Sequence, residues 1–194
     1  MAERKTSASL VKIWVEMLSG ASRRGRQEAS HELCLIAERE PEMLMPYIDD
    51  LVDALERPEA QTRWEILNCL THLALVDEAT VSKSVDLAEA SLFDDGSATV
   101  RLAAFKLLAR LGATAPMHSD QAWPLLNEAV QCYHGDPEYR DMLVALLEFA
   151  GGDISDKTRA ALIARVKFDA ENSRGFIKRF SQQIIDAATA QKKA

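Results

Sequence analysis

The chain has 194 residues, of which 47% are hydrophobic and 27% are charged, and its formal net charge is −7. This composition is that of an ordinary globular protein and excludes a disordered or fibrous chain. Aromatic residues make up only 6%, with 8 glycines and 6 prolines, too few for the turns and aromatic-rich short strands of a β-sandwich. We therefore expect an all-α protein.

Charge is distributed unevenly along the chain. Residues 1–26 carry six basic and two acidic groups, residues 27–100 carry four and 17, and residues 101–194 carry 13 and 11. An acidic middle segment repels phosphate groups, which argues against nucleic acid or an anionic membrane as a partner.

We expect no segment that would direct the chain out of the cytoplasm. No apolar run reaches the roughly 18 residues of a membrane span, and the start lacks the pattern of a signal peptide. The three cysteines, Cys34, Cys69 and Cys132, are odd in number and far apart, as expected for free thiols in a reducing compartment. We predict a cytoplasmic location.

Amphipathic helical patterns follow one another along the whole chain. An opening helix is predicted over about 7–18. Further helices are predicted over 43–56, 81–93, 122–133 and 156–168, and each is followed by a short polar turn and a second helix that begins near an arginine. These arginines are Arg26, Arg63, Arg101, Arg140 and Arg174. Their separations of 37, 38, 39 and 34 residues define a repeat.

The apolar positions of the second helices share one phase. Residues three, six, seven and ten places after the arginine fall on one helix face. In the second and third repeats they are Ile66, Cys69, Leu70, Leu73, Ala104, Leu107, Leu108 and Leu111. The arginines themselves are predicted to join neighbouring repeats through the acidic turns, as Arg101 with Asp95 and Arg140 with Asp136.

The third repeat carries a family resemblance. Its segment Asp95-Gly96-Ser97-Ala98-Thr99-Val100-Arg101-Leu102-Ala103-Ala104 resembles the turn and second helix of HEAT and armadillo repeats, and Pro46 and Pro124 resemble the proline that bends the first helix. The resemblance implies an α-α superhelix, a HEAT-like solenoid of about five helix pairs. It would form one domain over 1–194, with 1–21 as an N-terminal capping helix and 189–194 as a short tail.

The face that such solenoids use for binding is the concave one, lined by the second helices. Positions two, five and nine after each arginine are predicted to face it. From these we select six candidate partner-binding residues: Asn68, His72, Lys106, Arg110, Met142 and Phe149. Met142 and Phe149 would provide an apolar groove for a protein or peptide segment, and their burial against the next repeat is the alternative. The acidic helix with Asp49, Asp50 and Asp53 is a second candidate surface.

No catalytic or cofactor motif is recognisable. The sequence lacks a nucleophile elbow, a phosphate-binding loop and a zinc-protease motif. His31 with Cys34 and Cys69 with His72 have helical spacing for a metal site, but the pairs occupy different positions in their repeats. We therefore expect a non-catalytic interaction scaffold or adaptor without cofactor or metal.

The alternative is a nucleic-acid-binding or DNA-repair solenoid. Some glycosylases for alkylated bases resemble this architecture and hold damaged DNA on a basic surface with aromatic residues. The features that fit are Trp14, Trp64 and Trp123 and the basic residues after position 100. The acidic middle of the chain argues against it.

Overall fold

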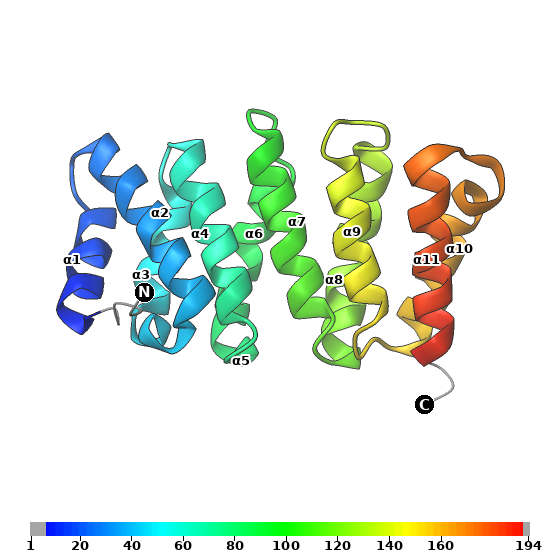
Figure 1. The fold of residues 1–194 in the computed structure, drawn as a ribbon, viewed down its shortest axis with the longest axis horizontal. Helices are drawn as coiled ribbons and strands as arrows, with labels where there is room; N and C mark the ends of the chain where they lie inside the picture. The colour runs from blue at the N-terminus through cyan, green and yellow to red at the C-terminus, as the bar shows by residue number, and fades with distance from the viewer. Residues whose placement is uncertain (1–6, 192–194) are drawn as a thin grey trace, which may run out of the picture. The chain divides into compact units, whose positions relative to one another are not determined.

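The computed structural model describes residues 7–191, and these form helices and no strand (Figure 1). The all-α prediction is confirmed. The chain has two compact units, Met1–Leu107 and Leu108–Ala194, which divide within one helix. No helix among residues 7–191 combines the length and the apolar character that crossing a membrane would require.

Unit 1 begins with the predicted opening helix. Ser7 caps helix α1 by accepting a hydrogen bond from Leu10 N at 3.2 Å, and Ser22 caps α2 in the same way through Gly25 N at 3.1 Å. The elements of unit 1 are α1 (Ala8–Leu18), α2 (Arg23–Arg39), η1 (Pro41–Met43), η2 (Met45–Tyr47), α3 (Ile48–Asp53), η3 (Ala54–Glu56), α4 (Ala60–Leu73), α5 (Glu78–Val81), η4 (Ser82–Ser84), α6 (Val85–Leu92) and the first ten residues of α7 (Ala98–Gly112).

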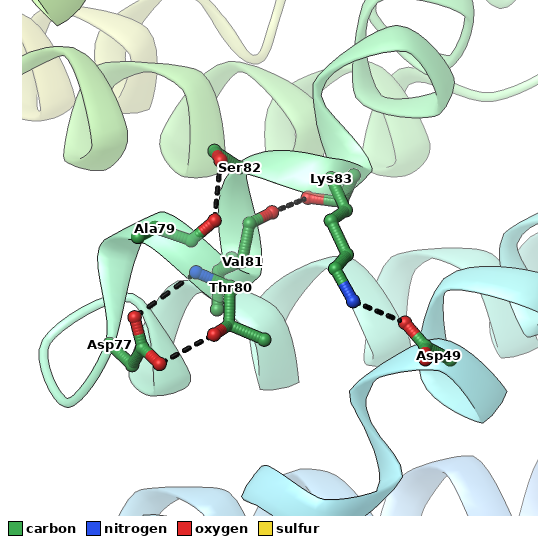
Figure 2. Close-up of polar contacts among 8 residues, drawn as sticks. Asp49, Asp77, Ala79, Thr80, Val81, Ser82 and Lys83 are labelled. Carbon is green, nitrogen blue, oxygen red and sulfur yellow. Dashed lines mark hydrogen bonds and ion pairs between the residues drawn. The ribbon is translucent and has the colours of Figure 1, made fainter.

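The first helices of unit 1 are broken, whereas the sequence predicted continuous ones over 43–56 and 81–93. Two 3₁₀ turns precede α3, and Pro41 is the first residue of η1 and Pro46 the second residue of η2. Between α5 and α6 the serine hydroxyls bond to the backbone, as Ser82 Oγ does to Ala79 O at 2.6 Å (Figure 2). Such local bonds compete with the regular helix ladder.

Figure 2 also shows what fixes this broken segment at its ends. The Asp77 carboxylate caps α5 by accepting hydrogen bonds from Thr80 N at 3.1 Å and from Thr80 Oγ1 at 2.5 Å. Lys83 Nζ lies 2.9 Å from Asp49 Oδ1 of α3, so an ion pair joins two consecutive first-helix segments.

The second helices α2 and α4 pack against each other and carry the core of unit 1 (Figure 1). The predicted apolar faces of α4 and α7 are buried, with Ile66, Leu70, Ala104 and Leu107 fully inaccessible to solvent. Arg26 forms an ion pair with Glu59, and Arg63 Nη1 lies 2.5 Å from Asp94 Oδ2. The arginines therefore join neighbouring repeats, but through the acid of the following turn.

Two predicted arginine partners need correction. Arg101 Nη1 donates to the backbone oxygen of Asp94 at 2.9 Å, one residue before the predicted Asp95. Arg140 is exposed, because it is the second residue of its helix, whereas Arg26, Arg63 and Arg101 are each the fourth.

Unit 2 contains the last turn of α7, α8 (Pro116–Cys132), α9 (Tyr139–Ala150), α10 (Asp156–Asn172) and α11 (Gly175–Gln191). Helix α8 starts six residues before the predicted 122, because Pro116 occupies its first turn. Helix α11 continues to Gln191, into the segment predicted as a tail. Arg159 Nη1 donates to Ala188 O at 2.8 Å near the end of α11, which satisfies a carbonyl in its last turn.

Candidate functional site

The outward side of α2 and α4 in unit 1, here called the α2–α4 face, is polar and solvent-accessible. On α2 the side chains of Glu28, His31, Leu35 and Glu38 are exposed. They recur at intervals of three and four residues, so they form one stripe along the helix. On α4 the half-buried residues Glu65, Asn68 and His72 recur at the same intervals, and the half-buried Trp64 is adjacent to Glu65.

A direct contact places these two stripes next to each other. His31 Nδ1 of α2 lies 3.1 Å from Glu65 Oε1 of α4. The His31 side chain is 53% exposed and that of Glu65 15%, so the pair lies at the surface with the carboxylate partly covered. The structure thus brings together the predicted face positions of the first two repeats, among them the candidates Asn68 and His72.

The α2–α4 face has groups that can hold an extended polypeptide. Within residues 7–191, Glu28 and Glu38 have no ion-pair partner and the Asn68 amide has no hydrogen-bond partner. A free amide can donate to and accept from a peptide backbone. The Trp64 indole lies one turn before Asn68, and its face can attract a cation. The sequence analysis did not place Trp64 on this face, because it directly follows Arg63 and only positions two, five and nine after each arginine were selected.

The thiols of Cys34 on α2 and Cys69 on α4 have raised pKa values. Burial, followed by the charge of Glu65, raises the pKa of Cys34 to about 12. Burial also raises the pKa of Cys69 well above its ordinary value. Neither cysteine is therefore ionised at neutral pH. Only the thiolate form acts as a nucleophile or binds a metal. No group of three His, Cys, Asp or Glu side chains within residues 7–191 is arranged to hold a metal ion.

The candidates on α7 lie at the surface. Lys106, in unit 1, is half-buried. Arg110, in unit 2, is also half-buried, and its Nη2 lies 3.0 Å from Glu148 Oε2 of α9. This contact shows that the side of α9 next to Arg110 is the one that carries Glu148.

Met142 and Phe149 are core residues, which corrects their assignment to a groove. Both have no solvent-accessible surface. The Phe149 ring stacks on Trp123 of α8 with the centroids 6.3 Å apart, and a Cβ at Gly112 would lie 2.9 Å from Phe149 Cε2. No groove can therefore be lined by these two side chains. The alternative of burial, which the sequence left open, is the observed one.

The error arises from the position of Arg140 within its helix. The prediction counted from Arg140 as if it were the fourth residue of its helix, but it is the second. The predicted face is therefore displaced by two residues, which is about 200° around the helix. With that shift the outward positions become Val144 and Leu147. Val144 is 36% exposed and Leu147 is half-buried. The sequence alone did not show that α9 starts at Tyr139, so the shift could not be predicted from it.

The tryptophans do not form a common surface. Trp123 is 9% exposed and stacked against Phe149, while Trp14 and Trp64 are half-buried. Base stacking requires an open aromatic face. Trp123 does not offer one, which removes one of the features that fitted the DNA-repair alternative.

Comparison with known proteins identifies the fold. A designed armadillo repeat protein in complex with the peptide (KR)4 matches with a TM-score of 0.75 and 15% identity, over 93% of this chain and 82% of the other. Computationally designed armadillo repeat proteins for modular peptide recognition match with a TM-score of 0.71 and 14% identity, over 92% and 82%. The armadillo repeats-only protein of Plasmodium falciparum matches with a TM-score of 0.66 and 10% identity, over 96% and 99%.

No protein-family model and no curated protein sequence matches the chain. The structural matches confirm the expected fold class, an all-α, armadillo-like α-solenoid.

Proposed function

We propose that this chain is a non-catalytic protein-interaction module whose α2–α4 face binds an extended partner segment rich in lysine and arginine. The observation that carries the proposal is the combination on one surface of unpaired carboxylates, an available amide and an indole. Glu28 and Glu38 would attract the basic side chains, Asn68 would hydrogen-bond the segment's backbone, and Trp64 would accept a cation over its ring.

Two further facts support a basic partner. Residues 27–100 carry 17 acidic groups against four basic ones, so the potential around this part of the chain attracts cations and speeds their encounter. One of the similar solved structures, the designed armadillo repeat protein, is a complex with the basic peptide (KR)4. That peptide is therefore a suitable first probe.

The test is a fluorescence anisotropy titration of labelled (KR)4 with the full chain and two charge-matched variants. Glu28→Lys alters the α2–α4 face, and Asp50→Lys makes the same charge change on α3 of the same unit, where Asp50 is also exposed. We expect Glu28→Lys to weaken binding about tenfold or more and Asp50→Lys at most about threefold, because a local contact exceeds a long-range effect. Equal losses would mean that only net charge matters and would refute the site.

Asn68→Ala tests the polar part of the surface without changing charge. Loss of a hydrogen bond to a peptide backbone should weaken (KR)4 binding about fivefold. Unchanged affinity would exclude Asn68 from the site. A duplex DNA fragment titrated under the same conditions should not bind, and salt-sensitive DNA binding would favour the nucleic-acid alternative instead.

A further inference from the structure

Unit 2 contains a pocket lined mainly by its first helices, α8 and α10. It lies between the C-terminal halves of α8 and α10 and the start of α9, and its volume is about 410 Å³. Small-molecule sites in proteins fall in this size range. The α8–α10 pocket is lined by Val130, Gln131, His134, Tyr139, Arg165, Phe168 and Asp169.

One side of the pocket is aromatic. The Phe168 side chain is 70% exposed, although it stands on a helix whose neighbouring positions are charged or buried. Tyr139 is almost wholly buried, and its ring centroid lies 4.7 Å from that of His134 at a tilt of 51°. A flat apolar group placed against Phe168 would remove this ring from water, and the gain in free energy would grow with the apolar area covered.

The charged side of the pocket holds a fixed cation. Arg165 Nε donates to Asn127 Oδ1 at 2.6 Å, which orients the guanidinium plane and leaves its two terminal amino groups for other acceptors. Among residues 7–191, no carboxylate lies within ion-pair distance of Arg165. The one acid in the pocket, Asp169, is engaged already, since Oδ2 lies 3.3 Å from His134 Nε2 and Oδ1 accepts from Ser173 Oγ at 2.7 Å.

Tyr139 adds a neutral hydroxyl group to the lining of the same pocket. Burial, and then the charge of Asp169, raise the pKa of the Tyr139 hydroxyl, while Arg165 lowers it. The hydroxyl therefore keeps its proton at neutral pH.

We propose that the α8–α10 pocket binds a carboxylate that carries an aromatic group, with the carboxylate on the Arg165 guanidinium and the ring against Phe168. A planar guanidinium offers two parallel donors that match a carboxylate. A cationic ligand is the poorer fit, because it would meet the charge of Arg165 while Asp169 is already bonded. This proposal does not depend on peptide binding at the α2–α4 face.

The test follows the amide signals of the full, ¹⁵N-labelled chain during titration with N-acetylphenylalanine and with its neutral amide. We expect the acid to shift signals of 130–134 and 165–169 and to bind at least about fivefold more tightly than the amide, because a hydrogen-bonded ion pair is lost in the amide. Equal binding of acid and amide, or shifts confined to other parts of the chain, would overturn the proposal.

Two variants and one control variant test the roles of Arg165 and Phe168. Arg165→Gln should abolish the preference for the acid, whereas Lys167→Gln, which removes an exposed cation that lies outside the pocket and beside Glu171, should keep it. Retention of the preference in Arg165→Gln would refute the assignment. Phe168→Ser changes an exposed side chain and should weaken both probes about threefold or more, and undiminished binding in that variant would equally refute it.

Two further probes distinguish the sources of such a carboxylate. A peptide ending Gly-Ser-Gly-Phe with a free C-terminus presents the same group as 3-phenylpropionate. Tighter binding of the peptide would identify a partner's C-terminal residue as the ligand, and tighter binding of phenylpropionate a free aromatic acid. Failure of both to bind would overturn the proposal.

Discussion

Carboxylates that accept bonds at the repeat turns have lowered pKa values. The hydrogen bond from Arg26 lowers the pKa of Glu59 against the opposing effect of burial. At Asp94 burial alone would raise the pKa, but bonds from Arg63 and from Gly96 N bring it below its ordinary value. The hydroxyls of Thr80, and of Ser155 and Thr158, lower the pKa of Asp77 and Asp120. In the folded chain these contacts therefore stabilise the ionised form of all four carboxylates.

Stability should consequently fall in acid. Because the folded pKa values lie below those of the unfolded chain, near 4, the unfolded state binds more protons as the pH drops. The free energy of unfolding, measured with urea, should be nearly constant from pH 7 to 5 and should decrease below about pH 4. Glu59→Gln should lose part of this acid dependence, so the difference from the wild type should shrink between pH 5 and 3. Stability that rises toward pH 3 would contradict the assignment.

The phase of helix α7 can be tested by neighbouring substitutions. Leu107 is fully buried, whereas Lys106 beside it is half-buried and polar at its tip. Leu107→Ala should lower the free energy of unfolding by about 2–5 kcal/mol and Lys106→Ala by about 0.5 kcal/mol or less. Urea denaturation of both variants provides the measurement, and equal losses would mean that the face is rotated.

Helix α9 offers the corresponding test of the corrected phase. Phe149→Ala removes a ring that packs on Trp123 and near Gly112, and should cost about 3–5 kcal/mol. Val144→Ala, on the exposed side, should cost less than about 1 kcal/mol. If Phe149→Ala were as stable as the wild type, the groove predicted from the sequence would regain its support.

A comparison of α4 and α7 with α9 shows which features the sequence could predict. In α4 and α7 the arginine is the fourth helical residue, so spacing from it predicted the buried face correctly. In α9 the helix starts after a turn in which Gly135 has φ +90°, and that turn displaces Arg140 by two positions. Apolar periodicity does not give the direction of the buried face when apolar residues also lie on the outward side, as Val144 and Leu147 do in α9. The polar residues of the α2–α4 face were accessible to prediction, because only one side of α2 is apolar.

At the scale of the whole molecule, the fold is shared with armadillo repeat proteins at 10–15% identity. Such similarity shows the backbone architecture, whereas the choice of partner depends on the surface side chains. Here the acidic groups are concentrated before residue 101. The charge distribution therefore separates an acidic first part from a nearly balanced second part.

Salt should weaken peptide binding through this charge. Raising NaCl from 50 to 300 mM shortens the range of electrostatic attraction, so the affinity for (KR)4 should fall about tenfold or more, mainly through slower association. Stopped-flow fluorescence at both salt concentrations separates the two rates. Salt-independent association would show that apolar contacts, not the acidic groups, guide the encounter.

The location of the bound peptide is the most direct test of the proposed function. We would record amide signals of the ¹⁵N-labelled full chain with and without saturating (KR)4. The account predicts that the largest shifts fall on the outward positions of α2 and α4, around Glu28, His31, Glu65 and Asn68. Shifts confined to α3 with Asp49, Asp50 and Asp53, or no shifts at all at saturating peptide, would contradict it.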